Sequence, residues 1–300
     1  MCAICGCSGS GDVVITDMAT GRHTHLGESP GHRHAHGSEE PHSHSTTSLS
    51  PEPAGHHSDD PKHATEAAHS HHHSNEPNLP RSRTIRLETE ILQRNNHLAE
   101  RNRGWFEGRE ILAINLMSSP GAGKTTLLER TIRELGQELQ VQVIEGDQET
   151  LRDAERIRAL GSPVIQINTG AACHLDAEMV SVAVRTLNPP LRSTLFIENV
   201  GNLVCPALFD LGERLRVVIA SVTEGDDKPA KYPQMFRAAD LIVLNKIDLL
   251  PHVEFDLERF TQSARQLNPE IVISRVSATR GEGLTDWYDY LRHWRDRPAT

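Results

Sequence analysis

An apolar run that breaks into a glycine turn and resumes as a helix constrains this chain more than any other feature. Residues 111–117 predict a strand buried on both faces, and an apolar-periodic helix begins at Lys124. The sequence between them, Ser-Ser-Pro-Gly-Ala-Gly over residues 118–123, has the pattern of a phosphate-binding loop. Its glycines allow successive backbone N–H groups to face one centre, where the helix dipole adds positive potential. We therefore expect a nucleoside triphosphate to bind here.

The residue types in this loop predict how the triphosphate is held. Lys124 is expected to reach the β- and γ-phosphates, and the Thr125 hydroxyl to hold Mg²⁺. Ser118 stands where the general pattern G-x-x-x-x-G-K-[ST] has glycine. The alternative, an ordinary glycine turn before a helix, is disfavoured because Gly-Lys-Thr-Thr follows a buried strand. The residues expected to contact the nucleotide are Pro120, Gly121, Ala122, Gly123, Lys124, Thr125 and Thr126.

Residues 1–80 differ from the rest of the chain in composition. They are dominated by His, Ser, Pro, Gly and Glu, and no Phe, Tyr or Trp precedes Trp105. Such a segment cannot bury enough apolar surface to offset its ordering entropy. We expect residues 1–80 to be a disordered metal-binding region. Residues 81–103 should form a helix that Gly104 ends, and residues 104–300 one folded nucleotide-binding domain.

From Arg109 onward, short apolar runs alternate with amphipathic stretches. The runs predict strands over residues 111–117, 141–145, 164–168, 194–198, 217–222, 241–245 and 271–276. The stretches predict helices over residues 124–138, 153–160, 174–187, 231–238, 255–266 and 283–295. This alternation is typical of a mostly parallel sheet covered on both faces. We predict the α/β class, a three-layer α/β/α P-loop fold with ligands beyond the carboxyl ends of the strands.

Charge and cysteine usage exclude several other classes. The formal net charge is −10, and no basic stripe suggests nucleic acid as a partner. The sequence contains no run of eighteen apolar residues, so it predicts no membrane span. The N-terminus lacks a secretory leader pattern. Three of the five cysteines fall within seven residues, which suits metal ligation better than a disulfide framework. We expect a cytoplasmic protein.

Two N-terminal features predict metal binding. Cys2, Cys5 and Cys7 bring three thiolates together, and soft sulfur favours Ni²⁺, Cu or Zn²⁺ over Mg²⁺. Residues 23–73 carry fourteen of the eighteen histidines, whose imidazoles are mostly neutral at pH 7 and able to ligate. The alternatives are incidental cysteines or half of a zinc ribbon, and a low-complexity linker or an expression tag at residues 71–73.

Two elements near the C-terminus predict the base of the nucleotide. Asn-Lys-Ile-Asp at residues 245–248 follows a predicted strand and resembles the N-K-x-D element of GTPases, whose aspartate accepts from guanine N1–H and the N2 amine. Adenine has an acceptor at N1, so a buried aspartate there would be unpaired and would reject ATP. The dipeptide Ser277-Ala278 matches the element that contacts the guanine carbonyl. We expect GTP and GDP, bound by Asn245, Lys246, Asp248, Ser277 and Ala278.

Acidic residues at two strand ends are candidates for a Mg²⁺ site. Asp147 is a candidate switch residue near Mg²⁺ or the attacking water. Glu198-Asn-Val-Gly201 stands where GTPases have D-x-x-G, so Glu198 would hold Mg²⁺ through water and the Gly201 N–H would sense the γ-phosphate. Asp153 is either part of this site or a helix N-cap. The candidate catalytic set is Lys124, Thr125, Asp147, Glu198 and Gly201.

Cys173, His174 and Cys205 predict a second metal site. A lone cysteine is more often a buried small hydrophobe, but two soft ligands stand together at a predicted helix start. Cys205 lies four residues beyond Gly201, in a segment that should move with the γ-phosphate. Three ligands are one short of a tetrahedral set, which a site shared across a symmetric dimer would complete.

Taken together, these residues resemble the HypB family of hydrogenase nickel-incorporation proteins, within the HypB/UreG-type nickel GTPases of the SIMIBI class. The resemblance covers nearly the whole chain. It rests on Cys2-x-x-Cys5-Gly-Cys7, the histidine-rich insert, and strings at residues 118–125, 168–174, 198–206, 224–229 and 245–248. The string Glu-Asn-Val-Gly-Asn-Leu-Val-Cys-Pro at residues 198–206 is the most specific. Ser118 is shared with this family.

The resemblance implies a GTPase domain over residues 104–300 that hydrolyses GTP slowly, dimerises with GTP bound, and helps to load nickel into the [NiFe]-hydrogenase large subunit. It implies a tight nickel site at Cys2, Cys5 and Cys7, and a weaker nickel or zinc site at Cys173, His174 and Cys205. The implied partners are the zinc protein HypA, the hydrogenase large subunit and, as a further candidate, the prolyl isomerase SlyD.

Three other functions fit parts of the sequence: a urease-type nickel GTPase of the UreG kind, a nickel buffer with a vestigial GTPase, and a GTPase with purely structural zinc. The N-terminal cysteine motif and the string around Cys205 disfavour the first. Intact Lys124, Thr125 and Asp248 disfavour the second.

The spacing between Gly201 and Cys205 suggests a mechanism. GTP and Mg²⁺ would order residues 198–201, which would shift Cys205 and change the metal affinity.

Overall fold

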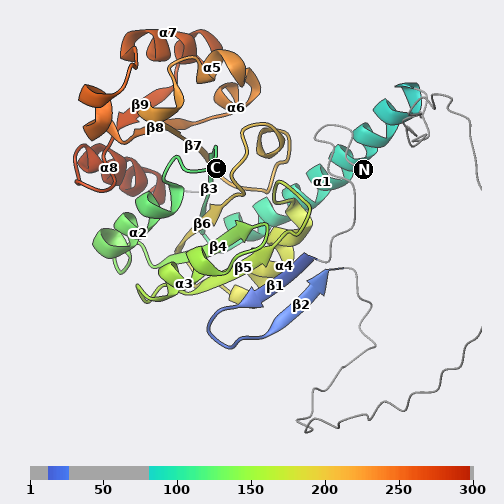
Figure 1. Ribbon diagram of the computed structural model, residues 1–300. Coiled ribbons are helices and arrows are strands. Elements are labelled where there is room, and N and C mark those ends of the chain that lie inside the picture. Colours follow the sequence, from blue (N-terminus) through green and yellow to red (C-terminus); the bar gives the residue numbers. More distant parts are fainter. Residues whose placement is uncertain (1–12, 27–80, 298–300) are drawn as a thin grey trace, which may run out of the picture. The chain divides into compact units, whose positions relative to one another are not determined.

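The structure, a computed structural model, describes residues 13–26 and 81–297, all within one compact unit. Seven of its strands are parallel and alternate with helices along the chain (Figure 1). Across the sheet their order is β5-β4-β6-β3-β7-β8-β9. They span Leu112–Ser118 (β3), Val141–Asp147 (β4), Val164–Asn168 (β5), Thr194–Glu198 (β6), Leu215–Ser221 (β7), Leu241–Asn245 (β8) and Val272–Arg275 (β9).

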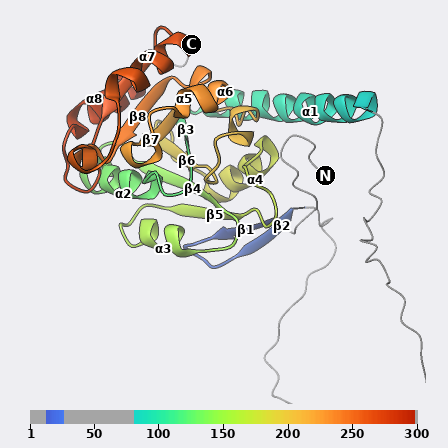
Figure 2. The same cartoon turned by 45° about the horizontal axis from the view of Figure 1, so that its top comes forward.

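Helices cover both faces of this sheet, which confirms the three-layer α/β/α prediction (Figures 1 and 2). One face carries α2 (Lys124–Leu135), α3 (Arg152–Arg158) and α8 (Leu284–Arg295). The other carries α1 (Arg81–Gly108) and α4 (Ala177–Leu187) over one half, and α6 (Pro233–Arg237) and α7 (Leu257–Leu267) over the other. Short elements complete the description: α5 (Lys228–Lys231) and the 3₁₀ turns η1 (Cys205–Ala207), η2 (Val222–Glu224) and η3 (Ile247–His252).

Alternation along the central strand shows how the core is divided. In β3, Leu112, Ile114 and Leu116 pack with α2 and α8, whereas Ala113 and Met117 pack on the opposite face. All seven residues of β3 are buried. Because side chains alternate between faces, a strand that is apolar throughout must be covered on both sides.

Residues 13–26 form a hairpin at the edge of the sheet, inside the segment expected to be disordered. Strand β1 (Val13–Asp17) pairs antiparallel with β5 and with β2 (His23–Leu26), which extends the sheet to nine strands among the described residues. Ile15 is 1% exposed. The hairpin has few apolar residues of its own, and the sheet supplies what they pack against. His23 and His25, two of the fourteen clustered histidines, therefore lie in a strand.

Helix α1 continues past Gly104, where the sequence predicted its end, to Gly108. A glycine inside a helix costs about 1 kcal/mol relative to alanine. Burying Phe106, which is 3% exposed, offsets that cost. The N-terminal turns of α1 extend beyond the rest of the domain (Figure 2).

The remaining boundaries lie close to prediction, with two informative differences. The helix predicted over residues 231–238 is α6, which begins at Pro233, and a separate short helix, α5, precedes it; Pro233 lacks the N–H that would continue α5. Helix α4 begins at Ala177 rather than residue 174, with Asp176 as its N-cap.

One buried hydrogen bond between α2 and α8 allows a stability prediction. Trp287, 1% exposed, donates from Nε1 to Thr131 Oγ1 over 2.9 Å. We expect Thr131→Val to lower the free energy of unfolding by about 1–3 kcal/mol, because the shape is kept but the indole N–H is left unpaired. Urea unfolding with an unchanged m-value measures this. Thr261→Val is the control, because it makes the same change in another helix, where the Thr261 hydroxyl donates to Leu257 O (2.8 Å). Equal losses in the two variants would contradict the assignment.

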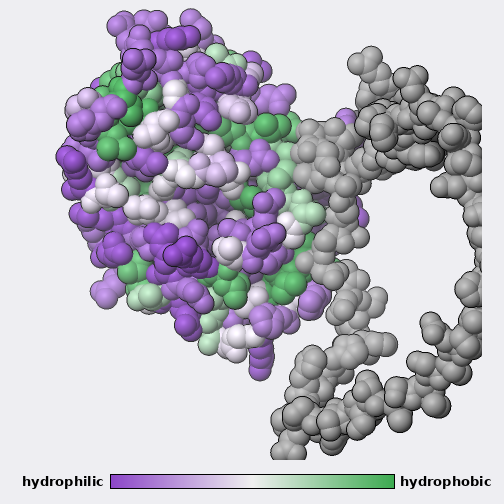
Figure 3. Space-filling model, in the orientation of Figure 1, coloured by the Kyte–Doolittle hydropathy of each residue, from purple (hydrophilic) through white to green (hydrophobic). Residues whose placement is uncertain are grey.

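Among the described residues, the exposed large hydrophobic side chains come from separate segments: Ile91, Leu151, Leu191, Val204 and Val272. On the face in Figure 3, hydrophobic residues stand in small groups between hydrophilic ones. None of the helices within residues 81–297 combines the length and the apolar character that a membrane span requires.

Candidate nucleotide site and metal site

The carboxyl ends of β3, β4 and β6 border a cleft of about 550 Å³. This is where a parallel sheet of this kind is expected to bind ligands. Most of the predicted phosphate and Mg²⁺ residues line it: Pro120, Gly121, Gly123, Lys124, Thr125, Thr126, Asp147, Glu198 and Gly201. Lys246 of the predicted guanine element lines it as well. Ala122 is buried beside them, and its carbonyl accepts from Asn245 Nδ2 (3.0 Å).

Two loop glycines adopt backbone conformations that other residues rarely take. Gly121 has φ 77° and Gly123 has φ 98°. A Cβ on Gly123 would come within 2.5 Å of Asn245 Nδ2, so the loop packs directly against the predicted guanine-binding segment. Gly201 also lies close to Pro120, since a Cβ there would stand 3.1 Å from Pro120 Cα. The phosphate loop is thus held from both sides.

The side chains in the phosphate cleft form a buried charged set. Lys124 Nζ donates to Ser118 Oγ (2.9 Å), and Thr125 Oγ1 donates to Glu198 Oε1 (2.6 Å). Glu198 is 3% exposed, and its Oε2 has no hydrogen-bond partner within the described part of the chain. Burial raises the pKa of Glu198, opposed by the Lys124 charge and the Thr125 hydrogen bond. A buried carboxylate oxygen beside a threonine hydroxyl fits a hydrated Mg²⁺.

A second acidic group lies beside Glu198. Glu145, Asp147 and Asp153 each place a carboxylate oxygen within 4.8 Å of the others. Burial, followed by the charges of Glu198, Asp147 and Asp153, raises the pKa of Glu145 to about 9. Asp153 is not an N-cap, because α3 is preceded by Leu151 and Asp153 instead pairs with Arg156 (2.8 Å). The N-cap alternative for Asp153 is therefore wrong.

The predicted base-binding residues lie where β8 and β9 end. Asn245 Oδ1 accepts from the N–H groups of Lys246 (2.8 Å) and Ala278 (3.1 Å), which ties the two segments together. Lys246 Nζ donates to Gly121 O (2.7 Å). Asp248 Oδ1 is buried without a hydrogen-bond partner among the described residues, and Arg280 stands 3.5 Å from its Oδ2. Ser277 is buried and accepts from Arg280 N (3.1 Å).

Cys173, His174 and Cys205 meet although they come from different strand ends; we call them the inner metal site. The two sulfurs are 3.3 Å apart, and Cys173 Sγ is 3.9 Å from His174 Nδ1. Two sulfurs each about 2.3 Å from one ion would stand about 3.3–3.8 Å apart. Burial lowers the pKa of His174 to about 4, so its imidazole is neutral and able to ligate at pH 7.

The other predicted metal ligands, Cys2, Cys5, Cys7 and the histidines between residues 32 and 73, lie outside the described residues.

Two residues near the phosphate loop were not singled out from the sequence. Glu224 accepts from Ser119 and from Ser221 N (2.9 Å), which fixes the start of the loop. The signal for it was present, since Ser221-x-x-Glu224 is a capping box. Arg156 lines the cleft and pairs with Glu129 of α2 (2.9 Å). The sequence contains no signal for this role of Arg156, because only the fold brings α3 against α2.

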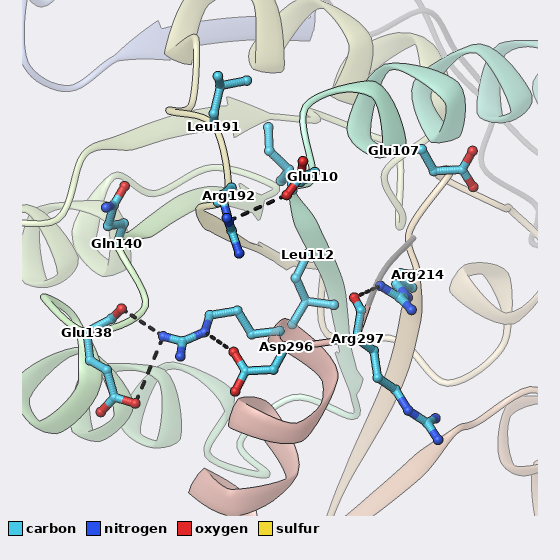
Figure 4. Close-up of a pocket in the computed structure, with 12 residues that line it drawn as sticks. Glu107, Glu110, Leu112, Glu138, Gln140, Leu191, Arg192, Arg214, Asp296 and Arg297 are labelled. Atoms are coloured by element: carbon cyan, nitrogen blue, oxygen red, sulfur yellow. Dashed lines mark hydrogen bonds and ion pairs between the residues drawn. The ribbon is translucent and has the colours of Figure 1, made fainter. Parts of the chain in front are cut away.

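Another cleft, of about 660 Å³, lies at the opposite end of the strands (Figure 4). Two of its arginines pair with nearby acids: Arg192 with Glu110 (3.4 Å), and Arg295 with Asp296 (3.0 Å). It is lined by residues that precede β3 and β4 rather than follow them. A triphosphate therefore fits the other cleft better, where Lys124 meets the loop amides.

Comparisons with known proteins agree with this geometry. The nucleotide-binding domain of the CobW/HypB/UreG family matches residues 112–275. Hydrogenase maturation factor HypB of Escherichia coli (strain K12) is 54% identical over 219 residues, which cover 73% of this chain and 76% of that protein.

Two crystal structures resemble this one. That of hydrogenase maturation factor HypB from Archaeoglobus fulgidus has a TM-score of 0.64 and 42% identity, and the match covers 68% of this chain and 100% of that chain. That of HypB from Helicobacter pylori in complex with nickel has a TM-score of 0.63 and 36% identity, covering 67% and 95%. With these matches, the chain belongs to the CobW/HypB/UreG family of nucleotide-binding proteins and, within it, to the HypB hydrogenase maturation factors.

Proposed function

We propose that this chain is a GTP-hydrolysing nickel metallochaperone that stores nickel and delivers it to the [NiFe]-hydrogenase large subunit. One observation carries the proposal. The Thr125 hydroxyl of the phosphate loop donates to Glu198 (2.6 Å), and the segment that leaves Glu198 reaches Cys205 of the inner metal site seven residues later. A short stretch of chain therefore joins the group that would sense the nucleotide to a metal ligand.

The chain's own residues supply positioning and charge for phosphoryl transfer. Lys124 places a buried ammonium beside the loop amides, where charge develops on the transferred phosphoryl group. Asp248 selects guanine, and Asn245 holds both halves of the base site together. A Mg²⁺ ion held by Thr125, Glu198 and Asp147 would neutralise charge on the phosphate oxygens. The Gly201 N–H would contact the γ-phosphate, since Gly201 already packs on Pro120.

Nickel is the cargo in this scheme, with zinc as an alternative occupant of the inner metal site. Sulfur and imidazole donors suit both ions. Val204, beside Cys205, is 41% exposed, so this part of the surface is accessible to a second copy of the chain. A homodimer formed with GTP bound would bring two sets of three ligands together and complete the coordination. HypA, SlyD and the hydrogenase large subunit are the proposed partners, in the cytoplasm.

Nickel affinity in two nucleotide states tests this coupling. In a full-length protein with Cys2, Cys5 and Cys7 changed to serine, thiolate-to-nickel charge-transfer absorption reports only on Cys173 and Cys205, the remaining cysteines. We expect the nickel Kd to differ at least about fivefold between GDP and a non-hydrolysable GTP analogue, a typical allosteric coupling. Cys205→Ser should remove the band. Equal affinities in both states would exclude nucleotide-driven transfer.

Storage is tested by deletion, and the fold decides where to cut. Because residues 23–26 form β2, the deletion should span residues 28–75. We expect it to remove most of the bound nickel at saturation while GTP turnover stays within twofold. Unchanged nickel stoichiometry would overturn the storage role.

A further inference from the structure

Asn95, on α1, holds both chain segments that carry ligands of the inner metal site. Its Oδ1 accepts from Ala177 N (2.9 Å), and its Nδ2 donates to Asp210 O (2.8 Å). Ala177 begins α4, three residues after His174, whereas Asp210 follows Cys205 by five residues. The Asn95 side chain is buried, with 5% exposed. One amide thus bridges the segment after β5 and the segment after β6.

Asn102, two turns further along the same helix, repeats this arrangement. Its Nδ2 donates to Ala177 O (2.8 Å) and to Leu211 O (3.1 Å), and the residue is 6% exposed. The two asparagines therefore bind both polar atoms of the Ala177 backbone and two successive carbonyls of the other segment. Ala177 N belongs to the first turn of α4, where backbone N–H groups have no partner within the helix, and Asn95 supplies that partner.

The surrounding contacts show that the second segment is seated tightly on α1. A Cβ on Gly212 would stand 2.5 Å from Ala99 O and 2.8 Å from Arg103 N, so only glycine allows this approach. Arg103 pairs with Asp210 over 2.8 Å. The same segment reaches the metal site through Phe209, whose ring centroid lies 4.0 Å from that of His174.

The two ligand segments also contact each other directly. Asn202 donates to Cys173 O (3.3 Å), and Leu175 N donates to Asn199 Oδ1 (3.1 Å). Residues 199–202 lie in the segment that should move with the γ-phosphate. The contacts to α1, in contrast, come from an element outside the nucleotide cleft and would stay in place while that segment moves.

We propose that Asn95 and Asn102 are positioning residues for the inner metal site, and that α1 sets the spacing of Cys173–His174 and Cys205. The inference rests on the proposed function of that site as a nickel site. It predicts that metal coordination depends on a helix that donates no ligand. That helix, α1, is followed directly by β3, the strand that leads into the phosphate loop.

The test compares Asn95→Ala and Asn102→Ala with Asn96→Ala, an exposed neighbour on the same helix. All three are made in the full-length protein with Cys2, Cys5 and Cys7 changed to serine. Nickel is titrated and the thiolate-to-nickel charge-transfer band is recorded. The GDP affinity and the urea midpoint of each variant are measured in parallel.

We expect Asn95→Ala and Asn102→Ala to raise the nickel Kd at least about tenfold and to shift or weaken the band at saturation, with GDP affinity within twofold. Asn96→Ala should match its parent. A lower urea midpoint with an unchanged band at saturation would mean that the asparagines serve stability alone, and would overturn the inference. If Asn102→Ala does not fold, Asn95→Ala decides. If the parent protein shows no band, both the nickel site and this inference fail; a normal parent band with unaltered variants rejects the inference only.

Discussion

Replacing Lys124 with alanine is expected to lower GTP turnover at least about 100-fold, the cost of removing one preorganised charge or donor from a phosphoryl-transfer or acyl-transfer site. Lys124 is 9% exposed, and its ammonium already donates to Ser118 Oγ at 2.9 Å. It therefore needs no reorganisation when charge develops on the γ-phosphate. Steady-state phosphate release under saturating GTP measures the effect.

Lys231→Ala is the matched control, because the Lys231 side chain is 61% exposed and its ammonium pairs with Asp227 (2.6 Å) away from the cleft. Its turnover should remain within twofold of the parent. If Lys124→Ala retained turnover within threefold, the assignment of the phosphate site would be wrong. A nickel buffer with a vestigial GTPase would then explain the chain better.

Changing Asp248 to asparagine is expected to exchange the base that the site accepts. The buried Asp248 Oδ1, unpartnered among the residues described here, fits the N1–H and N2 amine of guanine. Two hydrogen bonds to a charged group contribute about 3–6 kcal/mol, so GTP affinity should fall about 10²–10⁴-fold. Xanthosine triphosphate has a carbonyl in place of the N2 amine, which the asparagine amide can donate to. Its affinity should rise.

Competition of the two triphosphates against a fluorescent guanine nucleotide measures this exchange. Asp289→Asn is the control, since that carboxylate is 66% exposed on α8. Recovery of binding with xanthosine triphosphate would also show that the Asp248 variant is folded. Two results would contradict the role of Asp248 as the guanine acceptor. One is a variant that loses GTP binding without gaining xanthosine triphosphate binding, and the other is a variant that still binds GTP.

Local patterns in the sequence predicted the layers of the fold and the phosphate loop. Strands buried on both faces need long apolar runs, and a phosphate loop needs glycines at fixed positions, so both leave a record in consecutive residues. The β1–β2 hairpin leaves a weaker one. Its apolar residues are few, and Ile15 is buried only because β5 offers a free edge.

The candidate metal and catalytic residues were predicted from their chemistry, but their contacts were not. Nothing in the spacing of Cys173 and Cys205 states that their sulfurs lie 3.3 Å apart. Nor does the sequence show that Arg156 reaches Glu129, or that burial, together with the like charges around Glu145, raises its pKa to about 9. Such contacts depend on which strands are neighbours. Glu145 and Glu198, for example, lie in register on the adjacent strands β4 and β6.

The sequence by itself determined the fold class, the nucleotide loop, the candidate guanine element and the residue types that could hold a metal. Each is encoded within a few consecutive residues, because local backbone conformation and side-chain chemistry suffice to specify it. Only the tertiary structure decided that α1 holds the segments of Cys173, His174 and Cys205 together, through Asn95 and Asn102. Hydrogen bonds between residues about 75–115 positions apart arise from packing of the whole chain, and no local pattern records them.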